Sequence, residues 1–204
     1  MIQNPTKSFT IFSFLLGFII TTAQYPTVMN AENYVEEACK VTRYQDLCIK
    51  SLASYSNKAK KSPHKWARVG VSVTISEVKY VSKYLYKVKI RNHVKGKKVR
   101  TALSDCVECI QDTLDNLYKS LSVLRRLSFG EFNDQVGDVL TWLSAALTDE
   151  DTCLNGFDGA KIRNKSIVKV CNKVQNVSYI TSNALALVNK LASAGLEDLD
   201  ARHL

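Results

Sequence analysis

The chain has 204 residues, of which 46% are hydrophobic and 23% charged. This length suits one domain with a substantial core and is short for a two-domain enzyme, and the composition excludes a disordered tail or a fibrous protein. With 28 basic and 19 acidic residues the formal net charge is +9, and six cysteines raise the question of the redox compartment. The eight glycines and three prolines are few, which favours long helices.

The chain begins with the pattern of a secretory signal peptide. Lys7 precedes an apolar run at residues 9–20, and the small residues Thr21, Thr22 and Ala23 follow as a cleavage site. The run is shorter than the roughly 20 residues that cross a bilayer, so we expect no membrane anchor after cleavage. We expect residues 1–23 to be removed, residues 24–204 to form one secreted domain, and disulfides to form.

The sequence of residues 24–62 predicts two or three short helices, which are too short to be stable alone in water. Cys39 and Cys48 lie nine positions apart within them. That spacing suits a helical hairpin closed by a disulfide, which would stabilise it by about 3 kcal/mol at most.

Residues 63–204 predict four amphipathic helices, because apolar or small residues recur in alternating steps of four and three. The repeats fall at positions 67, 71, 74, 78, 81, 85 and 88; at Leu103, Val107, Ile110, Leu114, Leu117, Leu121 and Leu124; at Val136, Leu140, Leu143 and Leu147; and at Ile167, Val170, Val174, Val177, Thr181, Ala184, Val188 and Leu191. The linkers at 95–99, 128–133 and 149–164 are short. The pattern predicts an all-α fold, an antiparallel up-down-up-down four-helix bundle preceded by a short disulfide-closed helical hairpin.

The four remaining cysteines divide into two pairs. Cys106 lies near the start of the second bundle helix and Cys153 just past the end of the third, and antiparallel neighbours bring these ends together. Cys109 and Cys171 lie on diagonal helices, where we expect their Cα atoms to be roughly 9 to 10 Å apart, beyond disulfide reach. We predict two bridges and two buried free thiols, with a third bridge as the alternative.

The sequence gives little support for a redox or metal site. Cys106 and Cys109 have the C-x-x-C spacing of redox and zinc sites, but no strand precedes them, and His64, His93 and His203 are scattered. We expect no metal and no cofactor.

Nor does the chain carry a known catalytic motif. Asp112 and Asp115 are expected on a helix exterior, and Asp149, Glu150 and Asp151 at a helix end, in solvated positions. We therefore expect the protein not to be an enzyme.

Charge is distributed unevenly. Between Lys58 and Arg100 there are fourteen basic residues and one acidic residue, Glu77, whereas the rest of the mature chain is acidic. Secretion argues against nucleic acid as the partner. The asymmetry suits an anionic matrix on one side and a basic protein on the other, and an ordinary solvated lysine-rich face is the alternative.

Two sequons, at Asn164 and Asn176, are candidate glycosylation sites in a secreted chain, although Asn176 lies within a predicted helix.

Five motifs occur in a specific order along the chain: Cys39–Cys48, Asp105–Glu108, Thr141–Thr148, Thr152–Cys153 and Ser182–Leu187. Together they resemble the plant invertase and pectin methylesterase inhibitor family over almost the whole mature chain. The resemblance implies a four-helix bundle after a helical hairpin, with bridges Cys39–Cys48 and Cys106–Cys153. It also implies inhibition of a cell-wall or vacuolar hydrolase by a non-covalent one-to-one complex over the active-site cleft.

The motifs at 141–148, 153–157 and 182–187 are similar to those of pectin methylesterase inhibitors, and the Pro-Lys-Phe segment associated with invertase inhibitors is absent. Pectin methylesterase in the apoplast is therefore the expected target. Acid invertase is the alternative, and a basic wall protein that contacts anionic pectin without an enzyme target is another. Cys109 and Ile110 depart from the family pattern, as does the absence of an Asp near His64.

Inhibition would work by laying a rigid bundle face across a shallow groove, which needs about 800 Å² per partner. We expect exposed contacts on the second to fourth bundle helices at Asp112, Asp115, Thr141, Trp142, Ala145, Asn172 and Gln175. Trp142 is the sharpest of them, an aromatic anchor if it is exposed and core packing if it is buried.

Overall fold

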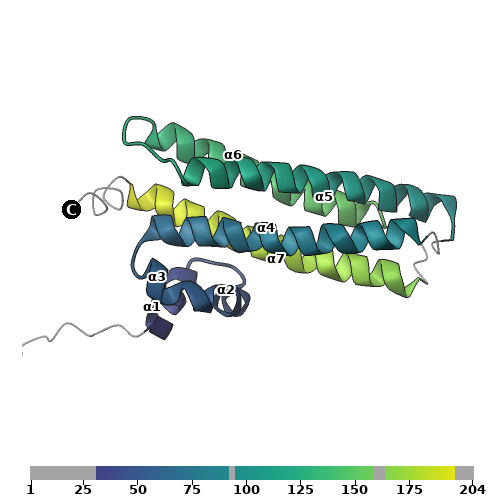
Figure 1. The fold of residues 1–204 in the computed structure, drawn as a ribbon, viewed down its shortest axis with the longest axis horizontal. Helices are drawn as coiled ribbons and strands as arrows, with labels where there is room; N and C mark the ends of the chain where they lie inside the picture. Colours follow the sequence, from purple (N-terminus) through teal and green to yellow (C-terminus); the bar gives the residue numbers. More distant parts are fainter. Residues whose placement is uncertain (1–30, 92–94, 159–163, 196–204) are drawn as a thin grey trace, which may run out of the picture.

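The computed structural model describes residues 31–91, 95–158 and 164–195, and within these ranges the chain is helical and has no strand (Figure 1). Short helices come first and four long ones follow: α1 (Ala31–Cys39), α2 (Gln45–Leu52), the 3₁₀ turn η1 (Ala53–Tyr55), α3 (Ser56–Ala59), α4 (Pro63–Ile90), α5 (Lys97–Leu124), α6 (Phe132–Asn155) and α7 (Lys165–Ala194). The predicted four-helix bundle with a preceding hairpin is confirmed. The predicted signal peptide lies outside the described residues.

The ends of the long helices follow capping chemistry. Ser62 caps α4, its hydroxyl accepting a hydrogen bond from the backbone N–H of Lys65, and Pro63 takes the first helical position. Asn164 caps α7 through the N–H of Ser166. Gly195 ends α7 with a φ of 66°, which favours glycine.

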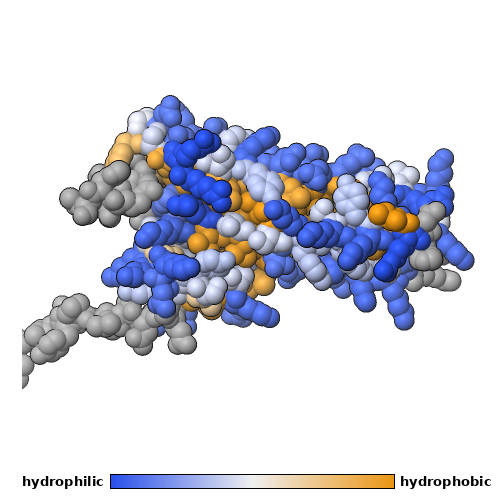
Figure 2. All heavy atoms as spheres, in the orientation of Figure 1, coloured by the Kyte–Doolittle hydropathy of each residue, from blue (hydrophilic) through white to orange (hydrophobic). Residues whose placement is uncertain are grey.

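The four long helices form a ring, because α4 and α6 each pack against both α5 and α7. Every predicted core position of α4, α5 and α7 is buried. Figure 2 shows hydrophilic side chains over most of one face, with hydrophobic ones along its middle. No helix in the described ranges is long and apolar enough to cross a membrane.

The prediction for α6 was partly wrong. Leu140 and Leu147 are only partly buried, and the helix continues to Asn155 instead of ending near residue 149. The core-facing side of α6 instead carries Val136, Val139, Leu143, Ala146, Glu150 and Cys153. The core-facing side of α6 was predicted from a repeat of aliphatic residues, and the buried Glu150 interrupts that repeat.

The hairpin packs on α4 and α7 around its own small core. Trp66 and Leu187 join the half-cystines Cys39 and Cys48 in this cluster. The indole N–H of Trp66 donates to the carbonyl oxygen of Lys60 over 2.7 Å. Close approach of α4 and α7 depends on Gly70, where an added Cβ would lie 3.0 Å from Leu187 Cδ1.

Candidate partner-binding surface

Polar contacts set the register of the antiparallel helices α5 and α6. Asn116 donates from Nδ2 to Asp149 Oδ2 over 3.3 Å, and one turn away Thr113 Oγ1 lies 3.5 Å from the carbonyl oxygen of Ala146. The Cys106–Cys153 disulfide joins the same two helices. The three contacts place residues 106–116 of α5 opposite residues 146–153 of α6.

An acidic edge runs along the outer side of α5. It consists of four exposed carboxylates spaced by three, four and three residues, which places them on one helix face: Asp105, Glu108, Asp112 and Asp115. Asp149 extends this edge onto α6. Burial, and then the nearby charge of Asp112, raises the pKa of Asp149. The edge therefore offers concentrated negative charge to a basic partner.

Trp142 lies beside this edge. It precedes Asp149 by seven residues, or two helical turns, so both side chains lie on the side of α6 that faces α5. Trp142 and Ala145 are partly buried, and Thr141 is exposed. Trp142 is thus neither fully exposed nor a core residue, and part of its surface stays accessible to solvent.

The seven predicted contact residues therefore form two groups. Asp112 and Asp115 lie level with the three α6 residues, and we call these five the α5–α6 surface: Asp112, Asp115, Thr141, Trp142 and Ala145. Asn172 is exposed and Gln175 half-buried on α7. The Glu150–Thr181 contact sets the register of α6 and α7, and it places Gln175 roughly 16 Å along the axis from Ala145.

The expectation that Glu150 is solvated was wrong. Its side chain is fully buried, its Oε1 accepts a hydrogen bond from the hydroxyl of Thr181 over 2.8 Å, and its Oε2 has no hydrogen-bond partner among the described residues. Burial raises the pKa of Glu150 to about 8, and the negative charges of Asp151 and Asp149 act in the same direction. A neutral carboxylic acid therefore lies inside the bundle at acidic pH.

The structure contains disulfides between Cys39 and Cys48 and between Cys106 and Cys153, while Cys109 and Cys171 are free. The two free thiols are half-buried, not buried as expected. Burial is the main cause that raises the pKa of each thiol. The helix registers place the two thiols about 15 Å apart along the bundle axis, which is beyond disulfide reach.

Cys106 of the C-x-x-C pair is engaged in the disulfide with Cys153, and the described residues contain no cluster of three or more side chains that could hold a metal ion. His64 is buried and its Nε2 hydrogen-bonds the carbonyl oxygen of Leu124 over 2.7 Å. His93 and His203 lie outside the described residues.

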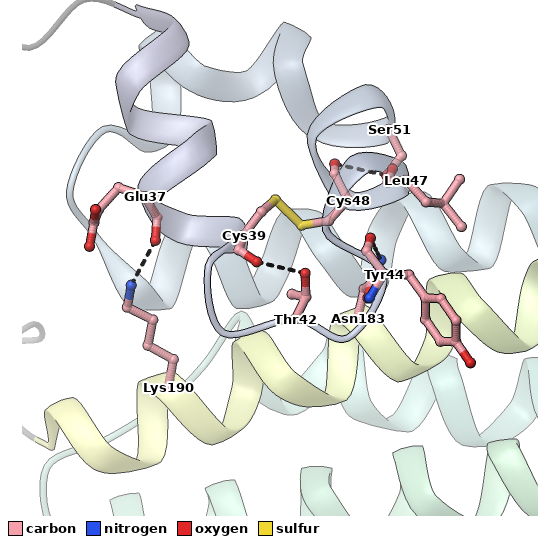
Figure 3. Close-up of a disulfide and its surroundings, with 9 residues drawn as sticks. All are labelled: Glu37, Cys39, Thr42, Tyr44, Leu47, Cys48, Ser51, Asn183 and Lys190. Carbon is pink, nitrogen blue, oxygen red and sulfur yellow. Dashed lines mark hydrogen bonds between the residues drawn. A yellow bond between two sulfur atoms is a disulfide. The ribbon is translucent and has the colours of Figure 1, made fainter.

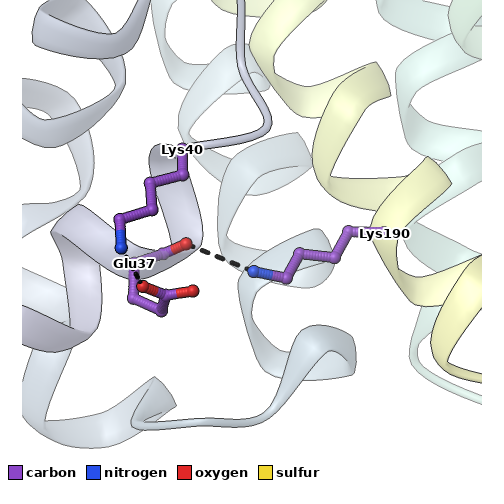
Figure 4. Close-up of polar contacts among 3 residues, drawn as sticks. All are labelled: Glu37, Lys40 and Lys190. Atoms are coloured by element: carbon purple, nitrogen blue, oxygen red, sulfur yellow. Dashed lines mark hydrogen bonds and ion pairs between the residues drawn. The ribbon is translucent and has the colours of Figure 1, made fainter.

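Asn183, which belongs to the motif at 182–187, has a structural role. Its Oδ1 accepts from the backbone N–H of Tyr44 over 3.1 Å, and its Nδ2 donates to the carbonyl oxygen of Tyr44 over 2.9 Å (Figure 3). Lys190, two turns further along α7, donates to the carbonyl oxygen of Glu37 over 3.2 Å (Figure 4). α7 thus holds both sides of the disulfide-closed hairpin.

Asn183→Ala should loosen the hairpin, because it removes both hydrogen bonds and leaves the backbone of Tyr44 without these partners. We expect a loss on the order of 2 kcal/mol of unfolding free energy. Amide exchange in residues 31–59 should accelerate. Urea unfolding and hydrogen exchange measure the two effects. Asn189→Ala, which removes an exposed amide from the same helix, should have little effect. Equal losses in both variants would contradict this role.

The two sequons lie on or next to α7. Asn164 is the partly buried cap of the helix, and Asn176 is exposed within it. The cap bond engages the amide oxygen of Asn164.

The chain is similar in sequence to known inhibitor proteins. A family model described as plant invertase/pectin methylesterase inhibitor matches residues 33–187. Over 169 residues the chain is 47% identical to pectinesterase inhibitor 6 of Arabidopsis thaliana, covering 83% of this chain and 80% of that protein. It is 33% identical to the 21 kDa protein of Daucus carota over 193 residues, covering 92% and 96%.

The fold agrees with solved structures. The crystal structure of a mutant form of a pectin methylesterase inhibitor from Arabidopsis superposes with a TM-score of 0.59 at 21% identity, covering 74% of this chain and 92% of that one. A second crystal structure of a pectin methylesterase inhibitor from Arabidopsis thaliana gives a TM-score of 0.54 at 20% identity, covering 77% and 95%.

Proposed function

Because the chain belongs to the plant invertase/pectin methylesterase inhibitor family, we propose that it inhibits a plant pectin methylesterase by forming a one-to-one, non-covalent complex over the active-site cleft. The 47% identity to a pectinesterase inhibitor, over most of both chains, is the observation that carries this proposal. As a member of a family of inhibitors, the protein is not an enzyme. It acts by covering a surface and not by chemistry of its own.

The α5–α6 surface is the part of the bundle best suited to this task. It combines Asp112 and Asp115 of the acidic edge with the partly exposed Trp142, and the Cys106–Cys153 disulfide and a close-packed core hold α5 and α6 together. A preorganised surface loses little conformational entropy on binding, and a tryptophan is a typical anchor of a protein interface. An enzyme cleft with basic residues at its rim is the complementary partner.

The proposal extends to the protein's location. The pattern of residues 1–23 supports secretion to the apoplast and cell wall, where glycans at Asn164 and Asn176 would be added on the way. Acid invertase is the second candidate target, because the matching family includes invertase inhibitors by name.

Replacing Trp142 tests the surface. We expect Trp142→Ala to weaken esterase inhibition by about tenfold or more, because the anchor loses its ring while the backbone stays in place. Tyr86→Ala removes an exposed aromatic side chain from α4 and should leave inhibition unchanged. Inhibition constants for both variants, with thermal unfolding to verify folding, provide the measurement. Undiminished inhibition by a folded Trp142→Ala variant would exclude the anchor.

Stoichiometry tests the complex itself. Light scattering after size-exclusion chromatography of inhibitor mixed with esterase should give the summed mass of one copy of each. A pectin oligosaccharide added in excess should slow association, since the oligosaccharide and the inhibitor would compete for the active-site cleft of the esterase. A complex that forms equally fast on a substrate-filled enzyme would contradict occlusion.

A further inference from the structure

A cavity of about 350 Å³ lies where the hairpin meets the bundle, away from the α5–α6 surface. Its walls come from η1, α3, the first half of α4 and the C-terminal end of α5. This volume falls within the range of small-molecule sites, about 300 to 1,000 Å³. The cavity is thus large enough for a sugar unit or a group of similar size.

Four basic side chains converge on this cavity, namely Lys58, Lys65, Arg68 and Arg125, and no acidic residue lines it. None of the four forms an ion pair within the described ranges, where Glu37 and Lys40 make the only ion pair. Like charges gathered around a concave site repel one another and produce a positive potential inside it. An anion with more than one charge would relieve this repulsion.

The other residues that line the cavity indicate which class of anion it would bind. Tyr55, Val69 and Leu121 supply aromatic and aliphatic surface, and Ser72 adds a hydroxyl. Arg68 is half-buried, and guanidinium groups bind carboxylates through two parallel hydrogen bonds. A ligand that uses both features carries carboxylates on rings that have an apolar face.

We propose that this cavity binds a de-esterified segment of an acidic, uronic-acid polysaccharide. The carboxylates would pair with Arg68 and Arg125, and a sugar ring would lie against Tyr55. The choice of this polyanion rests on the proposed function, because a pectin methylesterase exposes carboxylates on such a chain. The inhibitor would then be retained where the esterase has already acted, through a surface separate from the one that meets the enzyme.

Binding of a short, fluorescently labelled oligogalacturonide, followed by anisotropy at mildly acidic pH and low salt, tests the proposal. We expect the double variant Arg68→Gln, Arg125→Gln to bind about tenfold or more weakly, because two charge-assisted contacts are lost. Lys83→Gln, Lys87→Gln is the matched control: it removes the same charge from exposed positions on α4 outside the cavity. It should change affinity by about twofold or less. The fully methyl-esterified oligomer should bind the wild-type protein at least about tenfold more weakly than the acid form.

Equal weakening in both double variants would overturn the cavity site in favour of overall charge. Equal affinity for acid and methyl ester, or no binding by the wild-type protein, would also overturn it. Thermal unfolding of each variant verifies that the fold is kept. Esterase inhibition, measured without oligogalacturonide, should be unchanged in the cavity variant. If the wild-type protein binds the oligomer as expected but inhibits no esterase, the proposed function fails while the cavity site stands.

Discussion

The free energy of unfolding is expected to fall as pH rises from about 4.5 to about 8, because Glu150 is buried as a neutral acid. In the unfolded chain this carboxyl loses its proton near its ordinary pKa of 4.5, whereas the folded protein keeps the proton until the pH reaches about 8. Between these values the unfolded state binds fewer protons, so each pH step favours unfolding. The shift corresponds to a loss on the order of 5 kcal/mol across this window, and stability is greatest on the acidic side.

Glu150→Gln removes the titration while keeping the shape of the side chain. Urea unfolding near pH 5 and pH 8, with the disulfides intact, should show similar stability for both proteins at the lower pH. At the higher pH the variant should be the more stable by several kcal/mol. Asp138→Asn alters an exposed carboxylate elsewhere on α6 and should follow the wild-type curve. Parallel pH curves for the wild-type protein and Glu150→Gln would show that Glu150 does not carry the effect.

Removing the Cys106–Cys153 disulfide should cost more stability than removing Cys39–Cys48. The first bridge spans 47 residues and the second spans 9, and a longer closed loop restricts the unfolded chain more. Loop-closure entropy gives about 4 kcal/mol for the first and about 3 kcal/mol for the second. The two losses should also affect different parts of the fold, because one bridge joins two bundle helices and the other closes the hairpin.

Cys106→Ala, Cys153→Ala and Cys39→Ala, Cys48→Ala, compared by urea unfolding without reductant, measure this difference. In the second variant we expect faster hydrogen exchange confined to residues 31–59. Alkylation of the unfolded, unreduced wild-type protein should label two thiols, at Cys109 and Cys171. A larger loss from the hairpin bridge would contradict the loop-length argument, and a chain without free thiols would contradict the pairing.

Much of the fold could be predicted from the sequence because aliphatic residues recur at regular steps in three of the four long helices. The prediction was less accurate for α6, where Ala146 and Glu150 occupy core positions that an aliphatic pattern does not reveal. The acidic run Asp149–Asp151 also resembled a solvated helix end. Whether a carboxyl is buried depends on the neighbouring helix, here on Thr181, and a single helical repeat carries no information about that neighbour.

The sequence predicted which helices carry the proposed contact residues, but only partly how those residues lie relative to one another. Asp112 and the α6 residues around Trp142 lie together because α5 and α6 are sequential neighbours, which the short linkers indicated. Asn172 and Gln175 lie at another level because the registers between helices are set by contacts such as Glu150–Thr181. The role of Asn183 likewise depends on a partner 139 residues away, and no local pattern indicated it.

The most direct test of the proposed inhibition is a titration of the oxidised mature protein into a plant pectin methylesterase at mildly acidic pH. Acid release from pectin is followed, and a plant acid invertase is assayed in parallel. We predict that esterase activity declines linearly to an end point at one equivalent of inhibitor, while invertase activity is unaffected. Full esterase activity in the presence of excess inhibitor, with or without loss of invertase activity, would contradict the proposed function.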